Sequence, residues 1–505
     1  MIIGSKHQSE WQGILTDWSS GLDRSRPPYL IDDTALFNAI NFYYDPVTGY
    51  PTTRPGLKKW SAAAMPAGVI GVFEAIIGGV STVVAVCEDQ KLYAMDGSNT
   101  PQPVGSVAGA ERPSFQMMNG KLVLCTGGIQ STDLVTIGAK VTDFTYIADF
   151  EKGVAMDAYA RILGVGDPAN LERFGMSKVK DPDNWTYAAA PEDDAKRIDI
   201  GYLNGCAAVG LAPFMGDVFV FKRSPYSGRR EIYRVIMTDA ASANWSVRRV
   251  TRSASTLSPH FVVEVGDVFF MDLEGPKRLS RVEGFGDMPY VVDPYGSRIA
   301  GELSQYLQPD GFSIYDPVRR LMMVKPTKNS TSFYCVDAYN ERWTYFAFGP
   351  NIQSGAYCQG KMLFGAADGW IYEYDPASYQ DDGAQYSMVL ETKWFDLSPL
   401  FLNILKNLYL NVVGITGGSL TLSVKVAGQT KMSKVYDFAE AWWSWDLVNS
   451  ITPEDWTESL TKTLSGYVRD NRPVSADQFS VEVTVTQGLC AIGQLGGRIA
   501  TTGRA

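Results

Sequence analysis

One short pattern recurs along this chain of 505 residues and restricts its fold more than any other feature. The pattern is clearest over Gly360–Asp375, where two alternating runs flank the pair Asp368-Gly369. Such a pair between runs of period two is the strongest local signal for a β-hairpin. A turn followed by an apolar strand also recurs in four weaker copies: Asp89–Met95, Asn119–Cys125, Met215–Phe221 and Val265–Met271. The chain therefore predicts a repeating β-structure.

The composition agrees with many short strands. Aromatic residues make up 12% of the chain, and 48 Gly and 26 Pro favour strands that are joined by tight turns. Hydrophobic residues at 45% and charged residues at 20% are the balance of a folded globular protein. We therefore predict an all-β fold.

The spacing of the repeats indicates a β-propeller. The apolar strand of each expected unit is marked by one of six residues: Leu92, Leu122, Val218, Val268, Leu321 and Met362. The widest gap predicts a further unit around Arg161–Trp185, which gives about seven units of about 45 residues, the period of four-stranded propeller blades. An irregular array of β-sandwiches would also accommodate such hairpins.

The sequence pattern divides the chain into three parts. Residues 1–60 predict an N-terminal arm, with a short helix over Asp33–Asn41 and a hairpin over Asn41–Tyr50. Residues 61–385 contain the repeats, and residues 386–505 predict a separate β-sandwich-like domain. Four segments of that last part alternate with period two: Met388–Phe395, Asn407–Val413, Ser419–Val426 and Phe479–Thr486.

Charge and cysteine usage exclude several classes of protein. A net charge of −10 disfavours tight binding to nucleic acid over the whole surface. The six cysteines are far apart with no CxxC pair, so we expect free buried thiols and no zinc site. The first residues contain no long apolar run, so we expect no signal peptide, and no apolar run of the chain is long enough for a membrane-spanning helix. These features predict a soluble protein made in a reducing cytoplasm.

A basic cluster stands out in this acidic chain between positions 222 and 252. Its arginines could meet acidic residues of a neighbouring subunit on a solvated face. Alternatively, the cluster could touch phosphates of passing DNA or an acidic partner. The candidate contact residues are Lys222, Arg223, Arg229, Arg230, Arg234, Arg248, Arg249 and Arg252.

No motif predicts catalysis, a cofactor or a metal. His7 and His260 are the two histidines, and His260 stands at the entrance of a strand, where a structural role is expected. Carboxylates at Glu192, Asp193, Asp194 and Asp199 lack the contrast between acid and nucleophile that glycoside hydrolysis needs. Asp181–Trp185 predicts an Asx turn presenting Trp185, and Trp442, Trp443 and Trp445 predict either core packing or a platform that stacks on sugars. We expect a protein that is not an enzyme.

The order of five phrases resembles the tail nozzle or hub proteins of short-tailed bacteriophages, the packaged-DNA stabilisation type. The phrases span about two thirds of the chain, and Pro276–Leu279 departs from the family pattern. They are Asn38–Asn41 with Thr53–Leu57, Arg173–Ser177 with Asp181–Trp185, Gly210–Lys222 with Ile232-Tyr233, Val262–Phe270 with Glu274-Gly275, and Cys335–Trp343.

This resemblance implies a virion protein of the phage tail that is assembled in the host cytoplasm. It implies a homohexameric ring below the portal and adaptor proteins, in contact with other tail proteins and transiently with double-stranded DNA during ejection. A host-surface propeller that binds or cleaves glycans is the alternative, and an intracellular scaffold propeller is a third.

Overall fold

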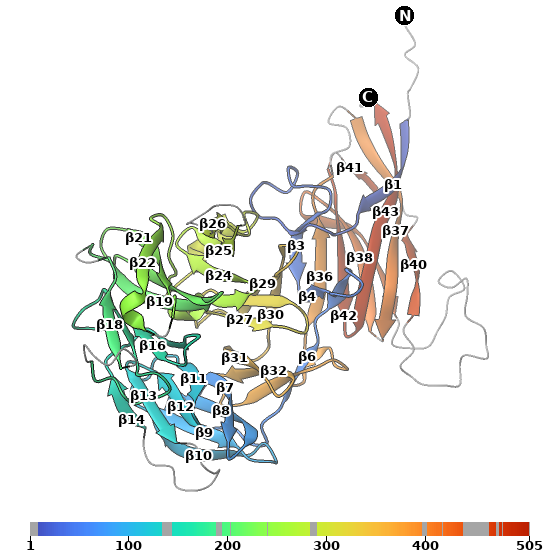
Figure 1. Cartoon of the computed structure of the whole chain (residues 1–505). Coiled ribbons are helices and arrows are strands. Elements are labelled where there is room, and N and C mark those ends of the chain that lie inside the picture. The colour runs from blue at the N-terminus through green and yellow to red at the C-terminus, as the bar shows by residue number, and fades with distance from the viewer. Residues whose placement is uncertain are drawn as a thin grey trace, which may run out of the picture.

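The structure is a computed structural model, and it describes most of the chain. The described ranges are 9–133, 144–187, 194–201, 204–239, 241–282, 290–395, 401–416, 418–437, 464–470, 474–476 and 478–503. Within them the regular elements are strands, apart from two short 3-10 turns and one α-helix, α1 (Ala300–Tyr306). The all-β prediction is confirmed. A ring of sheets lies beside a second, smaller pair of sheets (Figure 1).

The ring is a β-propeller with seven blades in the described part of the chain. Five blades are separate four-stranded sheets, the sixth is the first four strands of a ten-stranded sheet, and the seventh belongs to a six-stranded sheet. In each blade the first strand is innermost and touches the first strands of neighbouring blades. The propeller prediction is therefore confirmed, including the blade expected around Arg161–Trp185.

Consecutive strands pair antiparallel within each blade, from the axis outward. The first four blades are β7 (Val69–Ile77), β8 (Val80–Cys87), β9 (Lys91–Met95) and β10 (Pro101–Ser106); β11 (Ser114–Met118), β12 (Lys121–Cys125), β13 (Ile129–Asp133) and β14 (Thr145–Ala148); β15 (Val154–Met156), β16 (Ile162–Val165), β17 (Arg173–Met176) and β18 (Lys196–Asp199); and β19 (Ala207–Phe214), β20 (Asp217–Arg223), β21 (Arg230–Ile236) and β22 (Ser246–Thr251).

The remaining blades continue this order, but the outermost strand of the seventh comes from the N-terminal segment. These blades are β23 (Val263–Val265), β24 (Asp267–Asp272), β25 (Gly275–Arg281) and β26 (Tyr290–Pro294); β27 (Phe312–Asp316), β28 (Leu321–Lys325), β29 (Ser332–Asp337) and β30 (Arg342–Ala347); and β31 (Ile352–Cys358), β32 (Lys361–Ala366), β33 (Ile371–Asp375) and β6 (Gly56–Lys59).

The turns between the first two strands of several blades share one backbone conformation. Asn119 and Gly120 have φ values of 50° and 77°, and the pairs Met215-Gly216 and Gln359-Gly360 have similar values. Two consecutive residues with positive φ form the turn whose twist matches a β-hairpin, which explains why these pairs precede strands in the sequence. One marker was misplaced, because Leu92 lies in the third strand of its blade, β9, while the other markers lie in second strands.

The propeller core lies in the gaps between neighbouring blades. Tyr372 and Tyr374 of β33 are buried in the cluster between the sixth and seventh blades, and Trp370 packs against it. The interpretation of these aromatic residues as packing between blades is confirmed. All six cysteines are buried and free, as predicted.

The smaller pair of sheets is a β-sandwich around a shared apolar core. One sheet has the order β4-β5-β43-β37-β40, with β1 on β43 and β41 on β37, and the other has the order β3-β36-β42-β38-β39. The strands are β1 (Ser9–Thr16), β3 (Ala35–Ile40), β4 (Phe42–Tyr44), β5 (Pro51–Thr53), β36 (Ser387–Thr392), β37 (Phe401–Thr416), β38 (Ser419–Val426), β39 (Gln429–Asp437), β40 (Leu464–Asp470), β41 (Val474–Ala476), β42 (Ser480–Thr486) and β43 (Leu489–Gly503).

The N-terminal segment differs from the predicted arm. It is built into both parts of the molecule: β6 closes the seventh blade, while β1, β3, β4 and β5 belong to the sandwich. The predicted helix over Asp33–Asn41 is wrong, because β3 is an extended strand that pairs with β36 and contacts β30. These long-range partners bury Ala35, Leu36 and Ala39 and outweigh the local capping signal. The hairpin over Asn41–Tyr50 is present as β4 and β5.

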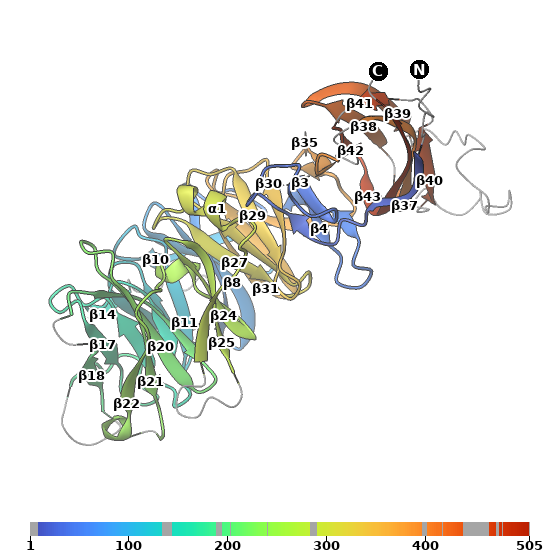
Figure 2. The ribbon, with the colours of Figure 1, turned by 90° about the horizontal axis from the view of Figure 1, so that it is seen from above.

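The sandwich is also not a separate domain. Strand β3 lies between β30 of the sixth blade and β36 of the sandwich, so that one ten-stranded sheet runs through both. Figure 2 shows β3 and β30 at this junction, with the sandwich on one edge of the propeller. Two short strands, β34 (Gln380–Asp381) and β35 (Ala384–Gln385), extend the sheet of the seventh blade beside β6, and β2 (Gly21–Leu22) pairs with β3.

Candidate functional site

A buried arginine forms the centre of the seam between propeller and sandwich. Arg54 has no exposed side-chain surface, and its two terminal nitrogens contact the two carboxylate oxygens of Asp381 at 2.9 and 2.6 Å. Its Nε donates to Asn41 Oδ1 at 3.1 Å, and its terminal nitrogens also donate to the backbone oxygens of Pro55 and Ala347. This bidentate pair fixes the N-terminal segment to β34, which lies beside β6 in the sheet of the seventh blade.

Aromatic rings and an asparagine complete the surroundings of this arginine. The guanidinium carbon lies 3.7 Å from the ring centre of Tyr386 and 4.6 Å from that of Phe348. Asn41 has a φ of 58°, a conformation that asparagine tolerates better than most residues. Its Oδ1 also accepts from the backbone N–H of Ala347 at 2.9 Å, and its Nδ2 donates to Ser387 O at 3.0 Å. Asn41 thereby connects β30 with β36.

The residues on either side of Arg54 anchor the segment in the two parts, Thr53 in the sandwich and Gly56 in the sheet of the seventh blade. Thr53 Oγ1 accepts from the Cys490 N–H at 3.0 Å and donates to the Cys490 carbonyl at 3.2 Å. A Cβ on Gly56 would lie 2.2 Å from the Gln380 carbonyl, so β6 can approach this backbone only with glycine there. The phrases Asn38–Asn41 and Thr53–Leu57 therefore build the seam.

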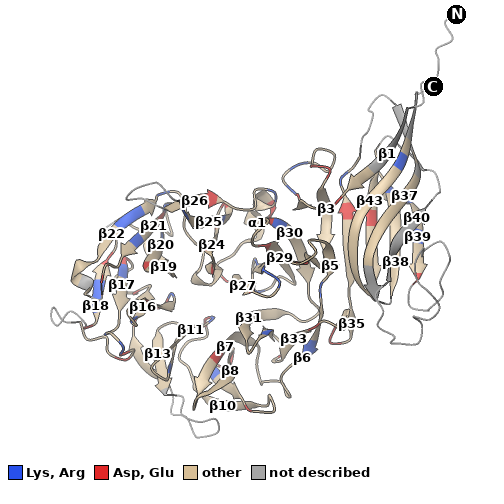
Figure 3. Ribbon diagram, turned by 45° about the vertical axis from the view of Figure 1, so that its right-hand side comes forward, with Lys and Arg blue, Asp and Glu red and all other residues tan. Residues whose placement is uncertain are grey.

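The basic cluster lies on the fourth blade, on the side of the propeller away from the sandwich, where Figure 3 shows Lys and Arg on β21 and β22. Its first member is not on the surface. Lys222 is fully buried and donates to Asn204 Oδ1 at 3.0 Å and to the Ile200 carbonyl, and burial lowers its pKa. Lys222 is therefore a structural residue and not a contact residue.

Most of the arginines pair with acids of the same chain. Arg229 lies 2.8 Å and Arg249 lies 3.8 Å from the buried Glu231 carboxylate. Arg234 contacts Asp217 at 2.7 Å, and Arg230 reaches the fifth blade. There it contacts the carboxylates of Asp272 and Glu274, each at 2.7 Å.

The last three members are Arg223, Arg248 and Arg252. Arg223 is half-buried, and its Nη1 has no hydrogen-bond partner among the described residues. Arg248 and Arg252 are exposed on or next to β22. The structure thus brings the cluster together on one blade but leaves few of its charges open to a partner.

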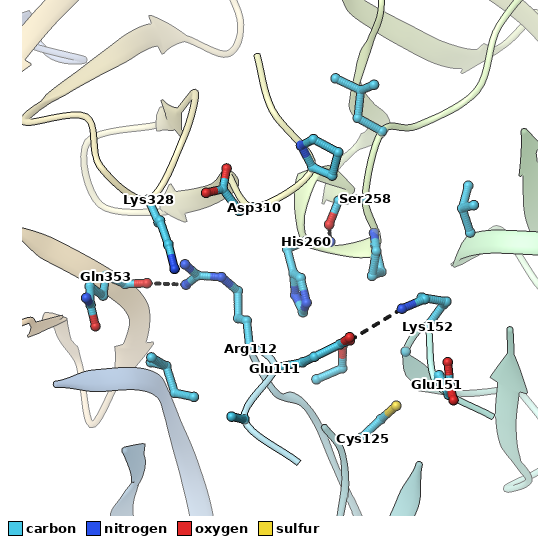
Figure 4. Close-up of a pocket in the computed structure, with 18 of the residues that line it drawn as sticks. Glu111, Arg112, Cys125, Glu151, Lys152, Ser258, His260, Asp310, Lys328 and Gln353 are labelled. Carbon is cyan, nitrogen blue, oxygen red and sulfur yellow. Dashed lines mark hydrogen bonds and ion pairs between the residues drawn. The ribbon is translucent and has the colours of Figure 1, made fainter. Parts of the chain in front are cut away.

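A pocket of about 460 Å³ opens on the propeller axis, where the sequence indicated no site. It is lined by loops that lead into innermost strands, and these loops carry Arg112 before β11, His260 before β23 and Asp310 before β27. Figure 4 shows these side chains around the pocket together with Lys328. Arg112, His260 and Asp310 all stand shortly before the innermost strand of a blade. An alignment of the blades would have revealed this shared position in the sequence.

Burial and mutual repulsion act on the basic groups around this pocket. Burial lowers the pKa of Arg112 to about 9, although Asp310 opposes the shift. Burial also lowers the pKa of Lys325, which does not line the pocket, to about 8, and the nearby Arg112 adds to that effect. The pKa of His260 falls to about 3 because of burial, Arg112 and Lys152, so its imidazole is neutral at pH 7.

The other acidic and aromatic candidates are structural in the described part of the chain. Asp194 pairs with Lys178 at 3.1 Å and Asp199 with Arg173 at 3.2 Å, while Glu192 and Asp193 lie outside the described residues. Trp185 is buried, and its Nε1 donates to Pro182 O at 2.8 Å.

Two further predictions concern sugar and metal binding. Trp442, Trp443 and Trp445 fall outside the described ranges, so their role stays a prediction. No group of three metal-ligating side chains is found among the residues that the structure describes. Within the same ranges, no helix has the length and apolar character needed to span a membrane.

No family model and no curated protein sequence matches this chain. Among solved structures, the chain is similar to BamB from Moraxella catarrhalis, with 11% identity and a TM-score of 0.37 over 66% of this chain and 94% of that one. It is similar to BBS1N in complex with ARL6DN, with 11% identity and a TM-score of 0.38 over 64% and 99%. Hydrazine synthase from Kuenenia stuttgartiensis has 8% identity and a TM-score of 0.36 over 61% and 96%. The assignment of the propeller rests on its strand pairing.

Proposed function

We propose that this chain is a structural subunit of a short-tailed phage tail, in the nozzle or hub ring below the portal and adaptor proteins. Six copies surround a channel that retains the packaged DNA and then conducts it during ejection. The protein acts in the virion after assembly in the host cytoplasm, and its role is mechanical rather than catalytic.

The observation that carries this proposal is the continuous sheet through propeller and sandwich. Strand β3 is hydrogen-bonded within the same ten-stranded sheet as β30 and β36, and Arg54 and Asp381 close the seam beside it. A wall element that withstands the pressure of packaged DNA needs such a junction, because a flexible linker would allow the two parts to swing. Two of the phrases that resemble tail nozzle proteins, Asn38–Asn41 and Thr53–Leu57, supply this seam.

The charge distribution also supports a conduit. Each phosphate that a protein neutralises releases counterions and adds affinity, which would slow a passing duplex. The chain has a net charge of −10, and the side chains of Arg229, Arg230, Arg234 and Arg249 are paired with its own carboxylates. This basic cluster therefore offers few unpaired cations to DNA.

The test is the mass and the shape of the purified full-length protein. Native mass measurement together with negatively stained images, with and without the adjoining adaptor ring, should give a ring of six copies with a central hole. Only a monomer under both conditions would contradict the proposal.

A second measurement separates the proposal from a glycan-directed protein. Incubation with host polysaccharide should release no reducing ends and show no saturable binding. Binding or cleavage that is lost when Trp442, Trp443 and Trp445 are replaced by Ala would instead support the glycan-directed function.

A further inference from the structure

The axial pocket places positive charges against one another with fewer acids than bases beside them. Figure 4 shows the Lys328 ammonium directed toward the Arg112 guanidinium. No carboxylate of the described residues lies within ion-pair distance, 4.0 Å, of either group. The buried Lys325 ammonium, on which Arg112 acts electrostatically, donates to Asn351 Oδ1 at 2.6 Å and to the Ile352 carbonyl, both neutral acceptors. Arg112 and Lys328 thus lie together on one side of the pocket, and the nearby Lys325 adds to the positive potential without lining it.

The acids that line the pocket are engaged elsewhere or lie on its other side. Glu111 pairs with Lys152 at 3.4 Å, and Glu88 accepts from Gln353 Nε2 at 3.3 Å. Asp310 is the acid on the cationic side, and its Oδ2 accepts from Thr327 Oγ1 at 3.2 Å. Glu151 lines the opposite side, near Cys125 (Figure 4). Asp310 alone therefore faces Arg112, Lys325 and Lys328.

The guanidinium is held in a fixed orientation. Its central carbon lies 3.8 Å from the ring centre of Phe312, and its Nη1 donates to the backbone oxygen of Gln353. Its other N–H groups have no acceptor among the described residues, and a guanidinium fork fits the oxygens of a carboxylate or a phosphate. Preorganisation of this kind reduces the entropic cost of binding. His260, neutral at pH 7, adds a ring nitrogen to the same wall without adding charge.

We propose that the axial pocket binds a small anion, a carboxylate or a phosphate, between Arg112 and Lys328. The bound anion relieves the repulsion between the two cations and supplies acceptors for the remaining guanidinium N–H groups. The pocket volume of about 460 Å³ is in the range of sites for small molecules. This site is independent of ring formation, so its failure would leave the proposed tail function untouched.

The experiment is isothermal titration calorimetry of the full-length protein with inorganic phosphate and, separately, with citrate, in an uncharged buffer at constant ionic strength. We expect saturable binding of one of them, and the ligand that binds assigns the anion as a phosphate or a carboxylate. R112Q and K328Q should each weaken that binding about tenfold or more, as expected for loss of a charge-assisted contact.

The matched control is K431Q, which removes one exposed lysine from β39 of the sandwich and should leave the affinity unchanged. Lys328 is exposed, so K328Q tests the site even if R112Q fails to fold. The proposal is overturned if neither anion binds the wild-type protein, if K328Q binds as tightly as the wild type, or if K431Q loses affinity to the same extent.

Discussion

The consequences of burying a charge are clearest at Arg54. Its side chain and that of Asp381 are 0% and 1% exposed, so neither charge has access to water. The guanidinium therefore depends on Asp381 and on the surrounding carbonyls for compensation, and the carboxylate depends on Arg54 and on the Gly349 N–H. The neighbouring pair Lys59–Asp382 has a similar separation of 2.8 Å, but its side chains are 38% and 36% exposed. Two adjacent aspartates thus make ion pairs in opposite environments.

This contrast predicts very different effects of two conservative substitutions. D381N leaves the Arg54 guanidinium buried without a counter-charge and should lower the free energy of unfolding by about 3–5 kcal/mol. D382N removes an exposed partner and should cost less than about 1 kcal/mol. Urea unfolding of both variants, followed by tryptophan fluorescence, measures the difference. Equal midpoints for the two variants would show that the seam does not depend on this pair.

At the scale of single elements, the hairpin turns show how local sequence sets the blades. Gly120 follows Asn119 with a φ of 77°, a region in which a side chain is strained. Open space surrounds the position, because a Cβ there would meet no atom within 4 Å. Any decrease in the free energy of unfolding on adding a methyl group at this turn therefore comes from backbone strain.

Two glycine substitutions in open space isolate the cost of backbone strain. G120A should lower the free energy of unfolding by about 1–2 kcal/mol, because alanine is disfavoured at positive φ. Gly97 also lies in open space but is not among the residues with positive φ, so G97A should be neutral or slightly stabilising. The melting temperatures of the two variants test this, and a G97A loss as large as that of G120A would refute the explanation.

At the scale of the whole molecule, the N-terminal segment pairs with strands from much later in the chain in both parts. Strand β6 closes the seventh blade on β33, and β1 pairs along β43 in the sandwich. The ten-stranded sheet then joins the two parts through β3. Because these connections run through backbone hydrogen bonds rather than a linker, we expect propeller and sandwich to unfold together.

Differential scanning calorimetry of the full-length protein should therefore show one transition in which propeller and sandwich unfold together. D381N should lower the temperature of this whole transition, while D382N should leave it nearly unchanged, since the Arg54–Asp381 pair is buried and the Lys59–Asp382 pair is exposed to water. Two resolved transitions, of which D381N shifts only one, would indicate that the parts fold independently.

The sequence alone indicated the local part of this structure. The turn pairs, the alternating strands and their period of about 45 residues identified an all-β chain with about seven blades, because each of these signals depends on neighbours a few residues apart. Buried cysteines and the packing of Tyr372 and Tyr374 followed from the same alternation.

The tertiary structure decided everything that depends on residues distant in the chain. It made a strand of Ala35–Ile40, paired Arg54 with Asp381 and buried Lys222 among carbonyls. It also brought Arg112, His260 and Lys328 from separate blades to one axial pocket. The physical reason is that strands and charged groups pair with whichever groups the closed ring places beside them. A local sequence pattern does not specify these distant partners.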